Sequence, residues 1–98
     1  MTDSQVDPLP LPPNALEQGG VEVLRALIVK NKLEVSLRRA FETADVWGML
    51  IADIARHAAR VFADETDLSE DEALQLIRDV FNAEIDMPTD RGSTNAVS

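Results

Sequence analysis

A regular spacing of apolar side chains over residues 47–62 constrains the fold more than any other feature of this sequence. Apolar residues recur there at the intervals of a helix that lies on a core: Trp47, Leu50, Ile51, Ile54, Ala58, Val61 and Phe62. Charged residues occupy the opposite side: Asp53, Arg56, His57, Arg60 and Asp64. The pattern therefore predicts an amphipathic helix with one buried and one solvated face. We expect it to begin at an N-cap on Thr43 and to end near Ala63.

A second helix is predicted from Ser69 to the residues just before Pro88. Ser69 and Glu72 have the spacing of a capping box, in which each side chain bonds the backbone amide of the other residue. Apolar residues follow at helical spacing: Ala73, Leu74, Leu76, Ile77, Val80, Phe81 and Ile85. Gly48, in the first turns of the preceding helix, suggests close backbone approach beside Trp47.

Residues 21–41 predict a β-hairpin, because two runs rich in Val, Ile and Leu flank the polar triplet KNK. A two-residue turn at Asn31 and Lys32 would place one set of apolar residues on a common face: Leu24, Ala26, Ile28, Leu33, Val35 and Leu37. A three-residue KNK loop would pair Leu27 with Val35 instead. We favour the first register because Asn tolerates left-handed backbone.

The remaining segments place a single domain between two less regular ends. Residues 1–20 contain PLPLPP and predict a largely extended or disordered proline-rich arm. Residues 21–86 form the domain, and residues 87–98 predict a disordered tail. We therefore expect an α+β fold in which two antiparallel helices pack on one face of the hairpin (ββαα). Because this core is thin and the strands are apolar on both faces, we expect dimerisation to extend or cover the sheet.

Charge is distributed unevenly, and its distribution argues against two classes of partner. Residues 42–98 contain thirteen acids and four bases, which accounts for the whole net charge of −9. An acidic surface repels phosphate backbones and anionic lipids, so nucleic-acid and membrane binding are not expected. The first twenty residues lack the pattern of a signal peptide, so we expect a cytoplasmic protein.

No catalytic or metal-binding arrangement is visible in the sequence. His57 follows Asp53 by one helical turn, but no nucleophile accompanies it, and a solvent-facing charge ladder with Arg60 and Asp64 explains it more simply. The acidic stretch that begins at Asp64 lacks the glycine and the final glutamate of a calcium-binding loop. We therefore expect no enzyme activity, no cofactor and no metal.

Two groups of charged residues are candidates for contacts with a partner. The hairpin contributes Arg25, Arg38 and Arg39, and in the favoured register Arg25 would face Arg38, so that an acid or an anion should join them. The first long helix contributes Asp53, Arg56, His57 and Arg60 on its solvated face. The arginines suggest protein or anion contacts rather than RNA, because no aromatic residue lies among them to stack bases.

Three segments resemble a family of short alphaproteobacterial proteins that carry a domain of unknown function. The segments are LPLPPNALEQGGVEVLRA, LEVSLRRAF and WGMLIADIARHAARVF, which together span residues 9–62. The resemblance implies a small bacterial α+β domain and transfers no catalytic residue. From the sequence we therefore expect a non-catalytic interaction or regulatory module that acts as a homodimer and binds a protein partner. The alternative is an accessory subunit that binds a small molecule or an anion through the hairpin arginines.

Overall fold

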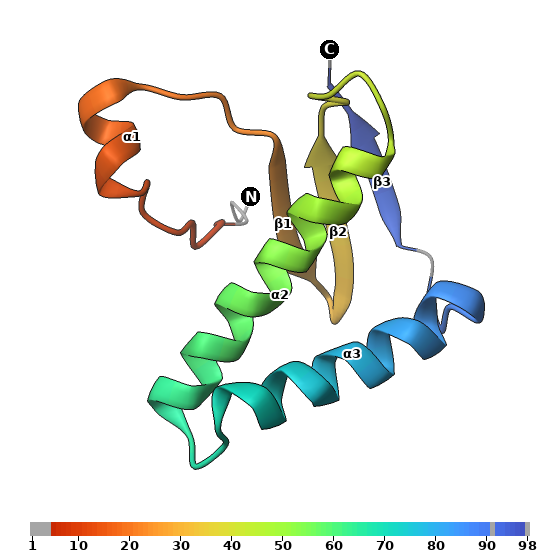
Figure 1. Ribbon diagram of the computed structural model, residues 1–98. Coiled ribbons are helices and arrows are strands. Elements are labelled where there is room, and N and C mark those ends of the chain that lie inside the picture. Colours follow the sequence, from red (N-terminus) through yellow and green to blue (C-terminus); the bar gives the residue numbers. More distant parts are fainter. Residues whose placement is uncertain (1–4, 91, 98) are drawn as a thin grey trace.

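The hairpin and the helix pair expected from the sequence are present in the computed structural model, which describes residues 5–90 and 92–97. In chain order the elements are α1 (Pro13–Gln18), β1 (Leu24–Val29), β2 (Lys32–Leu37), α2 (Asp45–Glu65), α3 (Glu70–Asp86) and β3 (Ser93–Ala96). The fold is of the α+β class, with a small sheet and two long helices (Figure 1). Residues 1–4 of the arm, and Arg91 and Ser98 of the tail, lie outside the described residues.

The turn of the hairpin lies at Lys30 and Asn31, so both registers considered from the sequence are wrong. These two residues have φ values of 52° and 66°, as a type I′ turn requires at its two central positions. The pairing shifts by two residues from the favoured register and joins Ile28 to Leu33 and Leu24 to Leu37. Because a shift of two leaves every side chain on its original side, the expected apolar face is kept.

A third strand completes the sheet on the far side of β2, in a segment that the sequence placed in a disordered tail. β3 runs parallel to β2, from Glu34 opposite Ser93 to Leu37 opposite Ala96. The chain enters this strand through Gly92, which has a φ of 65°, and a Cβ there would lie 2.7 Å from the Leu33 carbonyl oxygen. The side chains of β3 are all exposed, so the strand is held by its backbone and gives no apolar signal.

The proline-rich arm has no regular structure over residues 5–12 and then forms the short helix α1. The helix ends at Gln18, and Gly19 follows with a φ of 77°. In Figure 1 this part of the chain forms a separate loop beside the sheet. None of the residues of α1 is buried, so this segment contributes little to the interior.

Trp47, near the N-terminal end of α2, connects the helix pair to the loop that follows β2. Its indole Nε1 donates a hydrogen bond of 2.7 Å to the Arg39 carbonyl oxygen, and its ring meets Phe41 edge-on with centroids 5.9 Å apart.

Two details at the start of α2 differ from expectation. The N-cap is Ala44 rather than Thr43, and no side chain caps the helix. Among the described residues, apart from its chain neighbours and the backbone of its own helix, no atom lies within 4 Å of a Cβ built on Gly48, so no close approach by another segment of these explains this glycine.

The predicted capping box begins α3. The Ser69 hydroxyl accepts from the Glu72 amide at 3.0 Å, and the Glu72 carboxylate accepts from the Ser69 amide at 3.0 Å. The helix ends at Asp86, two residues before Pro88, as the sequence indicated. These bonds satisfy two backbone donors that would otherwise lack partners in the first turn.

Replacing Ser69 with alanine should therefore destabilise the protein by about 1 kcal/mol, the usual cost of a lost N-cap. Urea unfolding followed by circular dichroism measures this change. Thr43→Ala is the matched control, because Thr43 carries no cap in the structure. A loss as large in Thr43→Ala as in Ser69→Ala would contradict the assignment.

The interior of a single copy is small. Within the described residues only Ala59 and Ala73 are buried, at 0% and 2% exposure. The accessible surface is 8843 Å², whereas a compact chain of 10.8 kDa exposes about 5,500 Å². The radius of gyration is 15.6 Å, against about 12.6 Å for a compact domain of this length. One copy thus leaves most of its large apolar side chains in contact with solvent.

Candidate functional site

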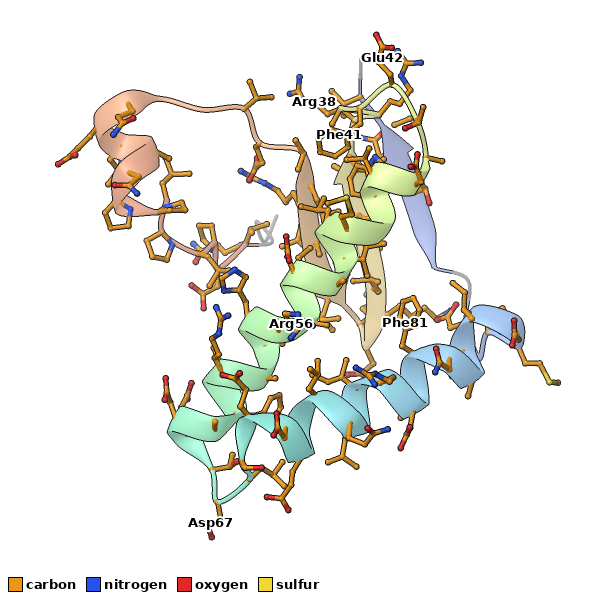
Figure 2. All side chains as sticks on the ribbon, viewed as in Figure 1. Arg38, Phe41, Glu42, Arg56, Asp67 and Phe81 are labelled. Atoms are coloured by element: carbon orange, nitrogen blue, oxygen red, sulfur yellow. The ribbon has the colours of Figure 1, made fainter. Side chains whose placement is uncertain are left out.

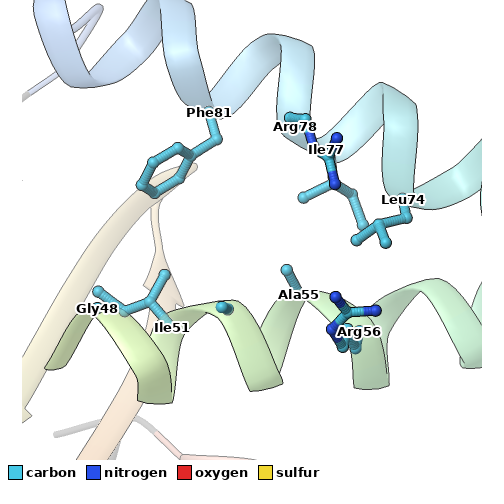
Figure 3. Close-up of a pocket in the computed structure, with 9 residues that line it drawn as sticks. Gly48, Ile51, Ala55, Arg56, Leu74, Ile77, Arg78 and Phe81 are labelled. Atoms are coloured by element: carbon cyan, nitrogen blue, oxygen red, sulfur yellow. The ribbon is translucent and has the colours of Figure 1, made fainter. Parts of the chain in front are cut away.

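The two long helices leave an apolar groove between them because they contact each other near their shared turn and then diverge (Figure 1). Figure 3 shows Leu74, Ile77 and Phe81 on α3 pointing toward Ile51 and Ala55 on α2 across this space. The groove has a cavity volume of about 240 Å³. Its lining residues are Gly48, Ile51, Ala52, Ala55, Arg56, Leu74, Ile77, Arg78 and Phe81. Because Ile51 and Phe81 in this lining are exposed, the groove is a candidate binding surface.

Two arginines are the charged members of this lining. Arg56 comes from α2 and Arg78 from α3, and within the described residues neither forms a salt bridge. Arg56 was a candidate contact from the sequence, whereas Arg78 was missed. The available signal for Arg78 was its position as the single basic residue among the six acids of α3. Together they give an apolar groove a positive edge.

The other predicted contacts of α2 are not brought into the groove. Arg60 forms a salt bridge of 3.6 Å with Glu70 rather than with the expected Asp64. Arg60 Nη1 also lies 3.4 Å from His57 Nδ1. Asp53 forms no hydrogen bond with His57 among the described residues, so the predicted charge ladder is present only in part. These residues form an exposed polar surface on α2.

Arg25 and Arg38 both contact Glu22 instead of facing each other. Arg25 forms a salt bridge of 2.9 Å with the Glu22 carboxylate, and Arg38 Nε donates a 3.0 Å hydrogen bond to the Glu22 carbonyl oxygen. The register pairs Arg25 with Ser36, so the predicted pairing of Arg25 with Arg38 is wrong. Figure 2 shows Arg38 at the end of the molecule opposite Asp67. The acid that the sequence required is thus supplied by the same chain.

Metal-ligating and membrane-spanning features were sought among the same residues. In the part of the chain that the structure describes, no group of three or more His, Asp or Glu side chains has a geometry that could hold a metal ion. No described helix combines the length and the apolar character that crossing a membrane requires. The candidate site is the groove between α2 and α3, which brings apolar side chains and two arginines together.

Two carboxylates have a pKa below their ordinary value because of hydrogen bonds. The amide and the hydroxyl of Ser69 lower the pKa of Glu72 from 4.5. At the other end of α3, the Thr89 hydroxyl and then the Thr89 amide, which donates at 2.8 Å, lower the pKa of Glu84. Both groups are on the surface, and their hydrogen bonds support the two ends of α3.

The free energy of unfolding should consequently depend on pH through Glu72. Because its pKa is lower in the folded chain, the unfolded chain binds the proton first as the pH falls. The stabilisation is complete above pH 4.5 and is lost as the pH falls through the folded pKa. Urea unfolding at a series of pH values should show a shallower acid dependence in Glu72→Gln, which removes the titrating carboxyl, than in the wild type. Identical pH profiles would contradict this origin.

The chain matches a family model and is similar to solved structures. A family model described as "Domain of unknown function (DUF5076)" matches residues 8–89. The chain is also similar to a solved structure described as that of "a putative pyruvate dehydrogenase from the photosynthetic bacterium Rhodopseudomonas palustrus CGA009". That chain is 42% identical with a TM-score of 0.73, and the match covers 97% of this chain and 99% of that chain. A search of curated proteins finds no match.

Proposed function

The chain belongs to the family described as Domain of unknown function (DUF5076), and on that premise we propose that it is a non-catalytic interaction module that acts as a homodimer and binds a protein partner. The family confirms the resemblance noted in the sequence. The alphaproteobacterial origin that the resemblance implied remains an expectation, as does a cytoplasmic location.

The observation that carries the homodimer is the apolar surface of a single copy. The total accessible surface of 8843 Å², polar and apolar together, exceeds the roughly 5,500 Å² of a compact chain by about 3,300 Å². Obligate homodimers bury about 2,000–5,000 Å² in total, or about 1,000–2,500 Å² per copy. Much of the exposed apolar surface lies on the two long helices: Met49, Ile51, Ile54, Val61, Phe62, Leu76, Val80, Phe81 and Ile85. A second copy can cover such a surface without any further chain.

The molar mass of the full chain in solution tests this proposal. Size-exclusion chromatography with light scattering should give twice the chain mass of 10.8 kDa. The dimer should persist on dilution to low micromolar concentration, because the copies of an obligate homodimer fold only together. A mass of 10.8 kDa at high micromolar concentration would overturn the homodimer.

For the protein partner we propose the polar surfaces that remain outside the helix groove. One surface is the exposed side of α2, with Asp53, His57 and Arg60. The other lies just after the end of β2, with Arg38 and Arg39. Charged residues at the rim of an interface set orientation and partner choice more than affinity. The motif PLPLPP offers a third surface of different chemistry.

Co-purification with a stoichiometric protein from the native cell, read by mass spectrometry, tests the partner. Arg60→Ala and Arg38→Ala should each be compared with the wild type, because they remove charge from the two surfaces separately. Loss of the partner in one variant identifies the surface. Failure of the wild-type chain to retain any stoichiometric protein would contradict the partner.

An anion-binding accessory role is less well supported, because Arg25 already pairs with Glu22 at 2.9 Å. A thermal shift with phosphate that Arg38→Ala abolishes would favour that role. The description of the Rhodopseudomonas palustrus structure names an enzyme but identifies no residue whose role could be transferred. Turnover of pyruvate by the purified chain would contradict the non-catalytic part of the proposal.

A further inference from the structure

The groove between α2 and α3 has the size of several side chains. An apolar cavity of about 150 Å³ is large enough to hold benzene, and this groove measures about 240 Å³. It extends along both helices, from Gly48 to Arg56 on α2 and from Leu74 to Phe81 on α3. Side chains at the spacing of a third helix fill such a space, as ridges of one helix fill the grooves of its neighbours.

Resting on the homodimer proposed above, we propose that the occupant is α3 of a second copy of this chain. Each copy then inserts α3 into the groove of the other, and the four long helices pack together around a two-fold axis. A two-fold contact uses the same patch on both copies, so the patch must be complementary to itself.

The apolar side of α3 meets this condition. Leu74, Ile77, Phe81 and Ile85 follow one another at intervals of three and four residues and so form one row on the helix. Phe81 is 45% exposed and Ile85 is 66% exposed, although both are large and apolar. The row spans eleven residue steps, or about 16 Å of helix. Two such rows in contact bury apolar side chains that a single copy leaves in water.

Charge favours the same occupant. Arg56 and Arg78 line the groove without a salt bridge to any described residue. The occupying helix carries six acids and one base: Glu70, Asp71, Glu72, Asp79, Glu84, Asp86 and Arg78. An acidic helix in a groove with arginines at its edge brings opposite charges together.

Charge also sets the relative direction of the two α3 helices. Glu70, Asp71 and Glu72 all lie in the first turn of α3. A parallel arrangement would bring two such acidic turns together, whereas an antiparallel arrangement separates them and opposes the helix dipoles favourably. The two copies of α3 are therefore antiparallel.

Cysteine scanning tests the position of the second copy, because the chain has no cysteine of its own. Single cysteines at Leu74, Ile77, Phe81 and Ile85 should give a covalent dimer with a short bis-maleimide at the positions nearest the two-fold axis. Ile28→Cys, on the sheet, is the matched control, because Ile28 is also apolar and is 71% exposed. Crosslinking at Ile28→Cys with none along the row would overturn the inference.

Phe81→Glu provides a second and independent test. A charge at the centre of the row should raise the dimer dissociation constant by about 100-fold or more, whereas Ile28→Glu should leave it unchanged. Circular dichroism of both variants verifies that the helices are retained. A dimeric wild type whose dissociation constant does not change in Phe81→Glu would reject this interface alone. A monomeric wild type would reject the homodimer itself.

Discussion

Replacing Trp47 with alanine is expected to lower the free energy of unfolding by about 3 kcal/mol, at the lower end of the range for losing a large aromatic side chain, because Trp47 is only half-buried. The substitution removes the edge-on contact with Phe41 and the 2.7 Å hydrogen bond to the Arg39 carbonyl oxygen. The same carbonyl accepts the Phe41 amide at 2.7 Å across Ala40, whose φ is 63°. Trp47 thus holds a turn with unfavourable backbone geometry between the sheet and α2.

Urea unfolding monitored by far-ultraviolet circular dichroism measures this loss. Trp47→Phe should lower the free energy of unfolding by less, because it removes only the hydrogen bond and keeps an aromatic ring against Phe41. Thr43→Ala is the surface control, since Thr43 is exposed, and should change stability by about 0.5 kcal/mol or less. A change in Trp47→Ala as small as in Thr43→Ala would show that Trp47 does not hold the loop between β2 and α2.

Replacing Ala73 with leucine is expected to destabilise the protein by about 1–3 kcal/mol through overpacking. Ala73 is 2% exposed near the start of α3, where this helix meets α2. A leucine has no space there unless the helices separate. Their separation would also change the shape of the groove farther along, so dimer formation should weaken in parallel.

Ala83→Leu is the matched control for that substitution. Ala83 lies on the same helix and is exposed, so leucine there should change stability by about 0.5 kcal/mol or less. Thermal unfolding and light scattering of both variants give the two readouts. Equal stabilities for Ala73→Leu and Ala83→Leu would contradict the close contact between the helices.

The sequence predicted those parts of the fold that depend on local pattern. The capping box fixed the start of α3 at Ser69, and alternation fixed which residues share the apolar face of the hairpin. The turn position was missed because Lys30, which has little preference for positive φ, adopts it here beside Asn31. β3 was missed because its exposed side chains carry no pattern and its parallel pairing depends on the path of both helices.

The candidate site could be anticipated only in part. Arg56 was identified as a surface residue of α2, but its place at a groove depends on how far α2 and α3 diverge, which no spacing in the sequence reveals. The apolar stripe of α2 was expected to lie on a core, yet Val61 and Phe62 are exposed in a single copy. The amount of apolar surface was predictable, whereas its location relative to a second chain was not.

Thermal unfolding of the full chain over about a hundredfold range of concentration tests most directly whether one copy is too open to fold alone. If the apolar helix surfaces are covered by a second copy, folding and association are coupled, and the melting temperature must rise with chain concentration. The expected result is such a rise, with loss of helical signal and of dimer mass in the same transition. A melting temperature that stays constant while the protein has the mass of one chain would contradict it.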